Sequence, residues 1–310
     1  MLKVTSRCVN RSYRLVPTPE VVEIVEFCLG YVSEKFREQG KLELYAFCFM
    51  STHYHLTLRD VGGCVSEFLK ELNSLLSRNL NAIRGTSGTN FEADPGIQTI
   101  LGADRVLESM AYDEANPVTA GIVMKSEEWM GVTSASMVMG QEREIQRPDA
   151  GIWSTKRRHA SRPASMRSGR AGYAGRSKLP KVVKLRLDRP PFHPELHDAQ
   201  LGARVESMRR ACEAKAAVER GGRRVLGMKR ARKIHWNTLA TPEEMFGRRP
   251  TFAADEPLTR RMLGRLRRAF LNAYAAALAA FKAGDQDVAF PEGTVMMRHR
   301  FGVRVVPYGL

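Results

Sequence analysis

Residues 41–60, "KLELYAFCFMSTHYHLTLRD", decide the fold of this chain. Its two halves, 41–50 and 53–60, are rich in aliphatic and aromatic residues, as β-strands are, and Ser51-Thr52 between them suits a short turn. The stretch therefore predicts a β-hairpin. Because side chains alternate along a strand, His53 and His55 would share one face and Tyr54 would lie on the other.

The segments around this hairpin predict an α+β protein. Thr18 and Pro19 have the residue types of a helix cap and first position, and Gly85 and Pro117 are expected to end helices. Helices are expected over 19–38, 68–83 and 103–116, and further strands over 11–17 and 96–101. This order is typical of a ferredoxin- or RRM-like split βαβ antiparallel sheet with one added helix. Helices would pack on one face of the sheet and leave the other free for a site.

The chain is basic, and its charge is unevenly distributed. Of a net +16, residues 1–150 contribute 15 Lys/Arg against 20 Asp/Glu, and residues 151–310 contribute 34 against 13. A basic half suggests a polyanion-binding module, most commonly for nucleic acid, with a membrane surface as the lesser alternative. We expect a domain over 1–148, a basic Gly/Ser/Pro/Arg linker over 149–190 and a mainly helical basic domain over 191–310. Helices are expected near 198–220 and 257–283, and strands within 287–290 and 299–306.

Cysteine usage and hydropathy indicate the compartment. The five cysteines are an odd number without Cys-x-x-Cys spacing, which argues against a disulfide framework or a zinc ribbon and favours free thiols in a reducing environment. The longest apolar run, 273–281, is too short to span a bilayer. We therefore expect a cytoplasmic protein without a membrane partner.

Two histidine pairs could bind a metal ion. His53 and His55, on one face of a strand, would present two neutral imidazoles side by side to a divalent ion, although such a pair can also be structural. His193 and His197 are four residues apart, but they have no third ligand nearby and Pro194 disturbs the helical register. Metal binding is expected only at the first pair.

Tyr112 and Asn116 could complete a site with His53 and His55. They are four residues apart in the predicted helix 103–116, so they would share one helical face. A phenol is a possible nucleophile and an amide oxygen is a possible third metal ligand. Taken alone, a tyrosine at such a position is more often part of the core.

The segments "MSTHYHLTL" and "MAYDEANPVTAGIV" together resemble the paired signatures of the HUH tyrosine transposases, and in particular of the REP-associated tyrosine transposases. The resemblance extends over about residues 1–140 and implies an HUH nuclease fold for 1–148. It implies that Tyr112 is the nucleophile and that His53, His55 and Asn116 bind Mg²⁺ or Mn²⁺. The implied reaction is cleavage and rejoining of single-stranded DNA through a 5′-phosphotyrosine, at hairpin-forming repeats.

Two residues depart from the family pattern, and other interpretations stay open. Thr52 stands where Asn is usual before the first His, and Thr119 where Arg is common, which leaves DNA contacts unassigned. The alternatives are a non-catalytic nucleic-acid-binding protein with an RRM-like sheet, or a replication or conjugation initiator of the same HUH class. One Tyr per chain allows a monomer or a homodimer.

Basic clusters in the second half are the expected DNA contacts, although each could instead be a solvated surface. The residues are Arg157, Arg158, Arg223, Arg224, Lys229, Arg230, Arg232, Lys233, Arg260 and Arg261.

Overall fold

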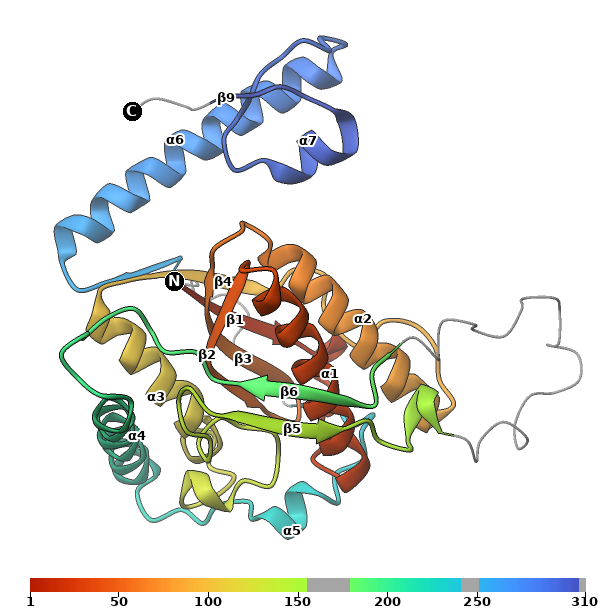
Figure 1. Cartoon of the computed structure of the whole chain (residues 1–310), viewed down its shortest axis with the longest axis vertical. Helices are drawn as coiled ribbons and strands as arrows, with labels where there is room; N and C mark the ends of the chain where they lie inside the picture. The colour runs from red at the N-terminus through yellow and green to blue at the C-terminus, as the bar shows by residue number, and fades with distance from the viewer. Residues whose placement is uncertain (155–178, 241–250, 307–310) are drawn as a thin grey trace, which may run out of the picture. The chain divides into compact units, whose positions relative to one another are not determined.

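The structure, a computed structural model, describes residues 1–154, 179–240 and 251–306 (Figure 1). The chain divides into two compact units, Met1–Thr251 and Phe252–Leu310. Arg157 and Arg158 lie outside the described residues.

The first unit is built on an antiparallel sheet with the strand order β2-β3-β1-β4 (Figure 1). Its strands are β1 (Leu2–Arg7), β2 (Leu42–Phe49), β3 (His53–Asp60) and β4 (Gly96–Leu101). The predicted hairpin of β2 and β3 and the predicted strand 96–101 are confirmed. The predicted strand over 11–17 is wrong, because Val9–Arg11 forms a 3₁₀ turn and Arg11 has a left-handed φ of 50°. The first strand, β1, precedes that turn.

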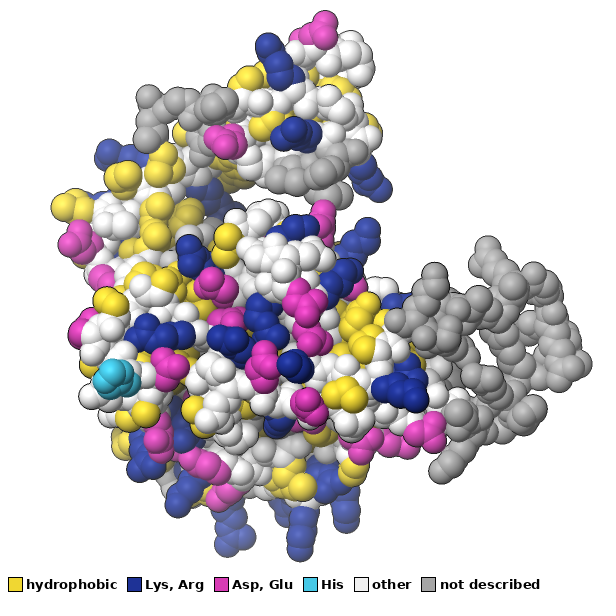
Figure 2. Space-filling view, viewed as in Figure 1, with side chains coloured by type: hydrophobic (Ala, Val, Ile, Leu, Met, Phe, Trp, Pro, Cys, Tyr) yellow, Lys and Arg dark blue, Asp and Glu magenta, His cyan; other side chains and the backbone are white. Residues whose placement is uncertain are grey.

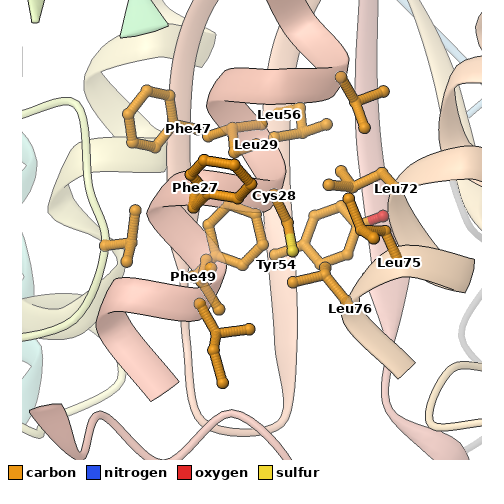
Figure 3. Close-up of a cluster of buried hydrophobic side chains, with 14 of the residues drawn as sticks. Phe27, Cys28, Leu29, Phe47, Phe49, Tyr54, Leu56, Leu72, Leu75 and Leu76 are labelled. Carbon is orange, nitrogen blue, oxygen red and sulfur yellow. The ribbon is translucent and has the colours of Figure 1, made fainter. Parts of the chain in front are cut away.

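Helices α1 (Pro19–Glu38) and α2 (Val65–Arg84) pack on one face of the sheet. The hydroxyl of Thr18 accepts the N–H of Val21 at the start of α1, and Gly85 ends α2 in a left-handed conformation with φ of 66°. Both predicted helices are therefore confirmed. Figure 3 shows Tyr54 of the hairpin among apolar side chains of α1 and α2. Its hydroxyl donates to Asn73 at 2.7 Å, so this buried phenol has a partner.

Helix α3 (Ala103–Thr119) covers the opposite face of the sheet, and α4 (Asp198–Arg220) packs on α3. The prediction of a free second face is therefore wrong, because the apolar side of α3 buries residues such as Met110 against it. Helix α3 also continues past Pro117, which was expected to end it. A proline this close to a helix end removes only one backbone hydrogen bond, and the helix ends at Thr119.

Residues predicted as a linker contribute buried structure to the first unit. Strands β5 (Glu142–Gln146) and β6 (Val182–Arg186) form an antiparallel pair, and β6 packs against α1. A 3₁₀ turn, Gly151–Trp153, packs against α2, and Trp153 lies edge-on to Phe27 with ring centroids 4.9 Å apart. The structure thus divides after Thr251, whereas the sequence placed boundaries at 148 and 190.

Helix α1 approaches β6 closely at Gly30. A Cβ at this position would lie 2.9 Å from a methyl carbon of Val183, so the absence of a side chain lets the helix and strand pack together. The remaining elements of the first unit are the 3₁₀ turn Ser126–Glu128 and the short helix α5 (Met228–Ala231).

The second unit contains one long helix and a small parallel strand pair. Its elements are β7 (Phe252–Ala254), α6 (Pro257–Lys282), β8 (Phe290–Pro291), α7 (Val295–Phe301) and β9 (Val305–Val306). Helix α6 confirms the predicted helix 257–283. The two predicted final strands are much shorter than expected, because residues 295–301 form α7. Phe290, Ala277 and Val303 form the buried centre of this unit.

Two further features of the chain follow from its side chains. All five cysteines, which lie within the described ranges, are free thiols. In the part of the chain that the structure describes, no helix has the length and apolar character needed to cross a bilayer.

Figure 2 shows side chains of both charges over β5 and β6, and Glu142 there pairs with Lys184 and Arg37.

Candidate active site

A polar row on the face of the sheet that α3 covers carries the first half of the site. Three cross-strand pairs of β1 and β3 make up this row: Lys3 with Thr57, Thr5 with His55, and Arg7 with His53. The residues between them point to the opposite face, where Tyr54 and Leu56 are fully buried in the core. Alternation along two paired strands therefore places both histidines on one surface.

Each histidine ring is oriented by a neighbouring threonine. The Oγ1 atom of Thr52 lies 3.0 Å from Nδ1 of His53, and that of Thr5 lies 2.9 Å from Nδ1 of His55. The two imidazole centroids are 4.7 Å apart, with the rings edge to face. When Nδ1 donates its proton to a hydroxyl, the lone pair that a neutral ring can offer an ion lies on Nε2.

Both imidazoles are held in the neutral form. The pKa of His53 is lowered to about 3, mainly by burial, with contributions from neighbouring His55 and from the positive charges of Arg7 and Arg11. Burial also lowers the pKa of His55 to about 3, with Lys3 and Arg7 contributing in the same direction. Neutral imidazole is the form that coordinates metal ions.

Helix α3 brings the second half of the site to the histidines. The Tyr112 side chain is 44% exposed, and its ring centroid lies 6.5 Å from that of His55. Because α3 continues through Pro117, Asn116 stays one helical turn from Tyr112 on the same face. His53, His55, Tyr112 and Asn116 all line one cavity of about 600 Å³. The structure thus brings together the four residues singled out in the sequence.

The side chains around this cavity suit a divalent ion. Asn116 is buried, and its Nδ2 donor has no hydrogen-bond partner among the described residues, a state that an acceptor atom of a bound ligand, such as a phosphate oxygen, would relieve while Oδ1 stays available to an ion. Within those residues no cluster of three His, Cys, Asp or Glu side chains could hold a metal ion. An ion bound by His53 and His55 would therefore need the amide oxygen of Asn116, or solvent, as its further ligand.

The cavity also has basic walls that sequence patterns did not reveal. Arg7 and Arg11 line it on the β1 side, and Lys215 lines it from α4 together with Cys212. Arg7 could have been found only from the register of β1 against His53. Lys215 lies far along the chain, and no motif connects it with the histidines.

The turn that carries Arg11 has an unusual backbone. Asn10 and Arg11 both have left-handed φ values, 53° and 50°, in consecutive positions. This conformation is unfavourable for residues with side chains and is often retained near functional sites. The Arg11 carbonyl accepts the N–H of Ala240 at 3.1 Å, which fixes the turn beside the cavity.

Within the first unit, none of the predicted DNA-contacting residues that the structure describes lines this cavity. Figure 2 shows Lys and Arg side chains projecting from the edge of the first unit at which α4 ends and α5 lies. The predicted residues of this segment are Arg223, Arg224, Lys229, Arg230 and Lys233, all exposed, and the partly buried Arg232. The guanidinium carbons of Arg14 and Arg84 lie 4.7 and 4.9 Å from the ring centroid of Trp236, so this ring already has partners.

Two other predicted sites can be placed. Arg260 and Arg261 are exposed in the first turns of α6, in the second unit. His193 lies 3.2 Å from a carboxylate oxygen of Glu195 and 3.6 Å from one of Asp104. His193 therefore has carboxylate neighbours of its own, and neither His193 nor His197 lines the candidate site.

Comparisons with known proteins give one structural likeness. No protein-family model and no curated protein matches the chain. A solved structure of a REP-associated tyrosine transposase bound to a REP hairpin is similar over 43% of this chain and 74% of that chain, with 16% sequence identity and a TM-score of 0.35. A TM-score of this size does not establish a shared fold, so the proposal below is based on the site itself.

Proposed function

We propose that this chain is a metal-dependent single-stranded DNA endonuclease and strand transferase, a transposase of the HUH tyrosine class that acts at hairpin-forming repeats. The observation that carries the proposal is the convergence of His53, His55, Tyr112 and Asn116 on one cavity. The strand order β2-β3-β1-β4, with α1 and α2 as the connecting helices, supports a split βαβ sheet of the HUH type.

In this proposal His53, His55 and Asn116 would hold the metal ion. Two imidazole nitrogens and one amide oxygen favour Mn²⁺ over Mg²⁺, because Mg²⁺ prefers oxygen ligands alone. A bound ion would polarise the scissile phosphate and offset its developing charge. Arg7 and Arg11 would add positive charge on the same side of the cavity and help to place the phosphate.

Tyr112 would carry the covalent step. Its Oη atom would attack the phosphorus, so that an Oη–P bond forms and the P–O3′ bond breaks. The phenol proton would pass to water, and the departing 3′ oxygen would take up a proton from water. Attack of a 3′-hydroxyl on the phosphotyrosine would reverse the step and join strands without an external energy source.

A single-stranded oligonucleotide that carries a hairpin tests the proposal. After incubation with Mn²⁺, a denaturing gel of end-labelled DNA should show a protein–DNA adduct for the natural chain and none for Tyr112→Phe. Tyr31→Phe, in α1 and outside the cavity, is the matched control and should form the adduct normally. An adduct that persists in Tyr112→Phe would contradict the assignment.

The non-catalytic alternative finds less support in the structure. An RRM-like module binds single strands on an open sheet face that displays aromatic side chains. Here α3 covers that face, and Thr57 is fully buried beneath it with its hydroxyl donating to Asp113. The histidines and the tyrosine instead line a cavity on this face.

A further inference from the structure

Lys3 lies next to the proposed nucleophile although it belongs to neither of the motifs that indicate the site. Its ammonium nitrogen is 2.8 Å from Oδ1 of Asp113 and 4.2 Å from the ring centroid of Tyr112. The Lys3 side chain is only 16% exposed, and that of Asp113 is fully buried. Lys3 therefore contacts two consecutive residues of α3 from the central strand β1.

The ion pair with Asp113 would by itself account for a lysine at position 3. Burial raises the pKa of the Asp113 carboxyl, whereas Lys3 and the hydroxyl of Thr57 lower it by stabilising the charged form. The Oδ2 atom of Asp113 accepts that hydroxyl at 2.7 Å. These contacts tie α3 to β1 and β3 directly beneath Tyr112, and they would exist whether or not the tyrosine reacts.

The position of its ammonium group over the Tyr112 ring gives Lys3 a second possible role. A cation over an aromatic face is attracted to it, and the attraction grows when the ring carries a negative charge. Asp113 holds the ammonium group in this place, so its position does not depend on bound DNA. The ring that Lys3 contacts is the one that faces His55.

We propose that Lys3 is a positioning residue for Tyr112, which holds the ring toward the histidine pair and keeps a positive charge over the ring whose oxygen reacts. The inference rests on the proposed function. In strand cleavage, Lys3 would hold the ring in place while Oη attacks the phosphorus. In strand joining, it would offset the negative charge that Oη takes up as the Oη–P bond breaks, so one residue would assist both directions.

Three variants separate this role from simple charge compensation. Lys3→Met removes the cation but leaves the Asp113 carboxylate buried without its partner, which by itself can destabilise the fold. The double variant Lys3→Met/Asp113→Asn removes the cation and the uncompensated charge together. Lys3→Arg retains a cation that can pack over an aromatic ring. Thermal unfolding of each variant shows which ones keep the native fold.

The measurement is the single-turnover rate of adduct formation with the hairpin oligonucleotide and Mn²⁺, with DNA affinity measured separately without metal. We expect the double variant to unfold at the temperature of the natural chain, to bind DNA equally well and to react about tenfold more slowly. Lys3→Arg should keep most of the natural rate. A purely structural role for the ion pair would not explain why the double variant, although folded, reacts more slowly than Lys3→Arg.

The outcomes distinguish the two proposals. A double variant that reacts at the natural rate would show that Lys3 only neutralises Asp113 and would overturn its positioning role. A Lys3→Arg variant as slow as the double variant would overturn the electrostatic part of that role. A natural chain that forms no adduct would overturn the proposed function and the role of Lys3 with it.

Discussion

At the scale of single residues, two threonines contact the histidines of the candidate site. The hydroxyl of Thr52 is 3.0 Å from Nδ1 of His53. Thr5, on the neighbouring strand, makes the equivalent contact with His55. Hydrogen bonds of this kind hold the plane of an imidazole. The two threonines therefore orient both rings.

Replacing Thr5 by Val should weaken metal binding without changing the fold. Valine has nearly the same shape as threonine but cannot hydrogen-bond to Nδ1 of His55, so the ring would lose its preferred orientation. We expect Mn²⁺ affinity, measured by calorimetry, to fall about 10- to 100-fold. Thr99→Val, on β4 and outside the cavity, is the control. Equal affinity in the two variants would show that the threonine does not orient the histidine.

Local sequence patterns predict some of the residues of this site but not others. His53 and His55 are recognisable because strand alternation places them on one face, and Tyr112 and Asn116 because of helical spacing. Lys3 and Arg7 carry no such signal, since only the pairing of β1 with β3 brings them to the same surface. Residues that enter a site through strand register or helix packing are not visible in a local pattern.

At the scale of secondary-structure elements, local chemistry set some boundaries and tertiary packing set others. The first helix begins and the second ends where Thr18-Pro19 and Gly85 predicted, because caps act on the adjoining backbone alone. The end of α3 was mispredicted at Pro117, because the favourable burial of this helix outweighs one lost hydrogen bond. Strand β1 was missed because its mixed composition becomes strand-like only between β3 and β4.

Helix α4 is joined to α3 through a buried arginine. The Arg209 side chain is 4% exposed and donates to Glu127 at 2.7 Å and to Glu213 at 3.2 Å. Glu114 of α3 lies 3.8 Å away, and burial raises its pKa to about 7 even though Ser134 and Arg209 favour its charged form. This arginine compensates several carboxylates at the contact between the two helices.

Removing Arg209 should therefore destabilise the first unit strongly. We expect Arg209→Met to lower the free energy of unfolding by about 3–5 kcal/mol, because it leaves Glu114 and Glu213, whose side chains are only 10% and 14% exposed, without their cationic partner. Arg210→Met is the matched control, since that side chain is 71% exposed and its pair with Glu206 should contribute at most about 1 kcal/mol. Urea unfolding followed by circular dichroism measures both. Similar midpoints for the two variants would argue against a structural role for the buried network.

At the scale of the whole molecule, composition gave a misleading domain boundary. The excess of Gly, Ser, Pro and Arg after residue 148 suggested a linker, yet this segment contains Trp153 and the alternating strand around Val183 and Leu185, all buried. Alternation of apolar and charged residues in "VVKLRL" is a half-buried strand pattern that average composition conceals. A few apolar residues at regular spacing determine packing more strongly than the charge around them.

This packing predicts which fragments of the chain can fold. A fragment of residues 1–148 would expose the faces of α1, α2 and α3 that β6, the turn at Trp153 and α4 cover. Loss of the Trp153 contact alone should cost about 3–5 kcal/mol, a large share of the stability of an ordinary domain. We expect residues 1–251 to unfold cooperatively and residues 1–148 to bind a hydrophobic dye and unfold without a sharp transition. A cooperative transition in the shorter fragment at the midpoint of the longer one would show that the segment after residue 148 is dispensable for the fold. In that case the wall of the cavity formed by α4 would be an addition to a self-sufficient core of sheet and helices.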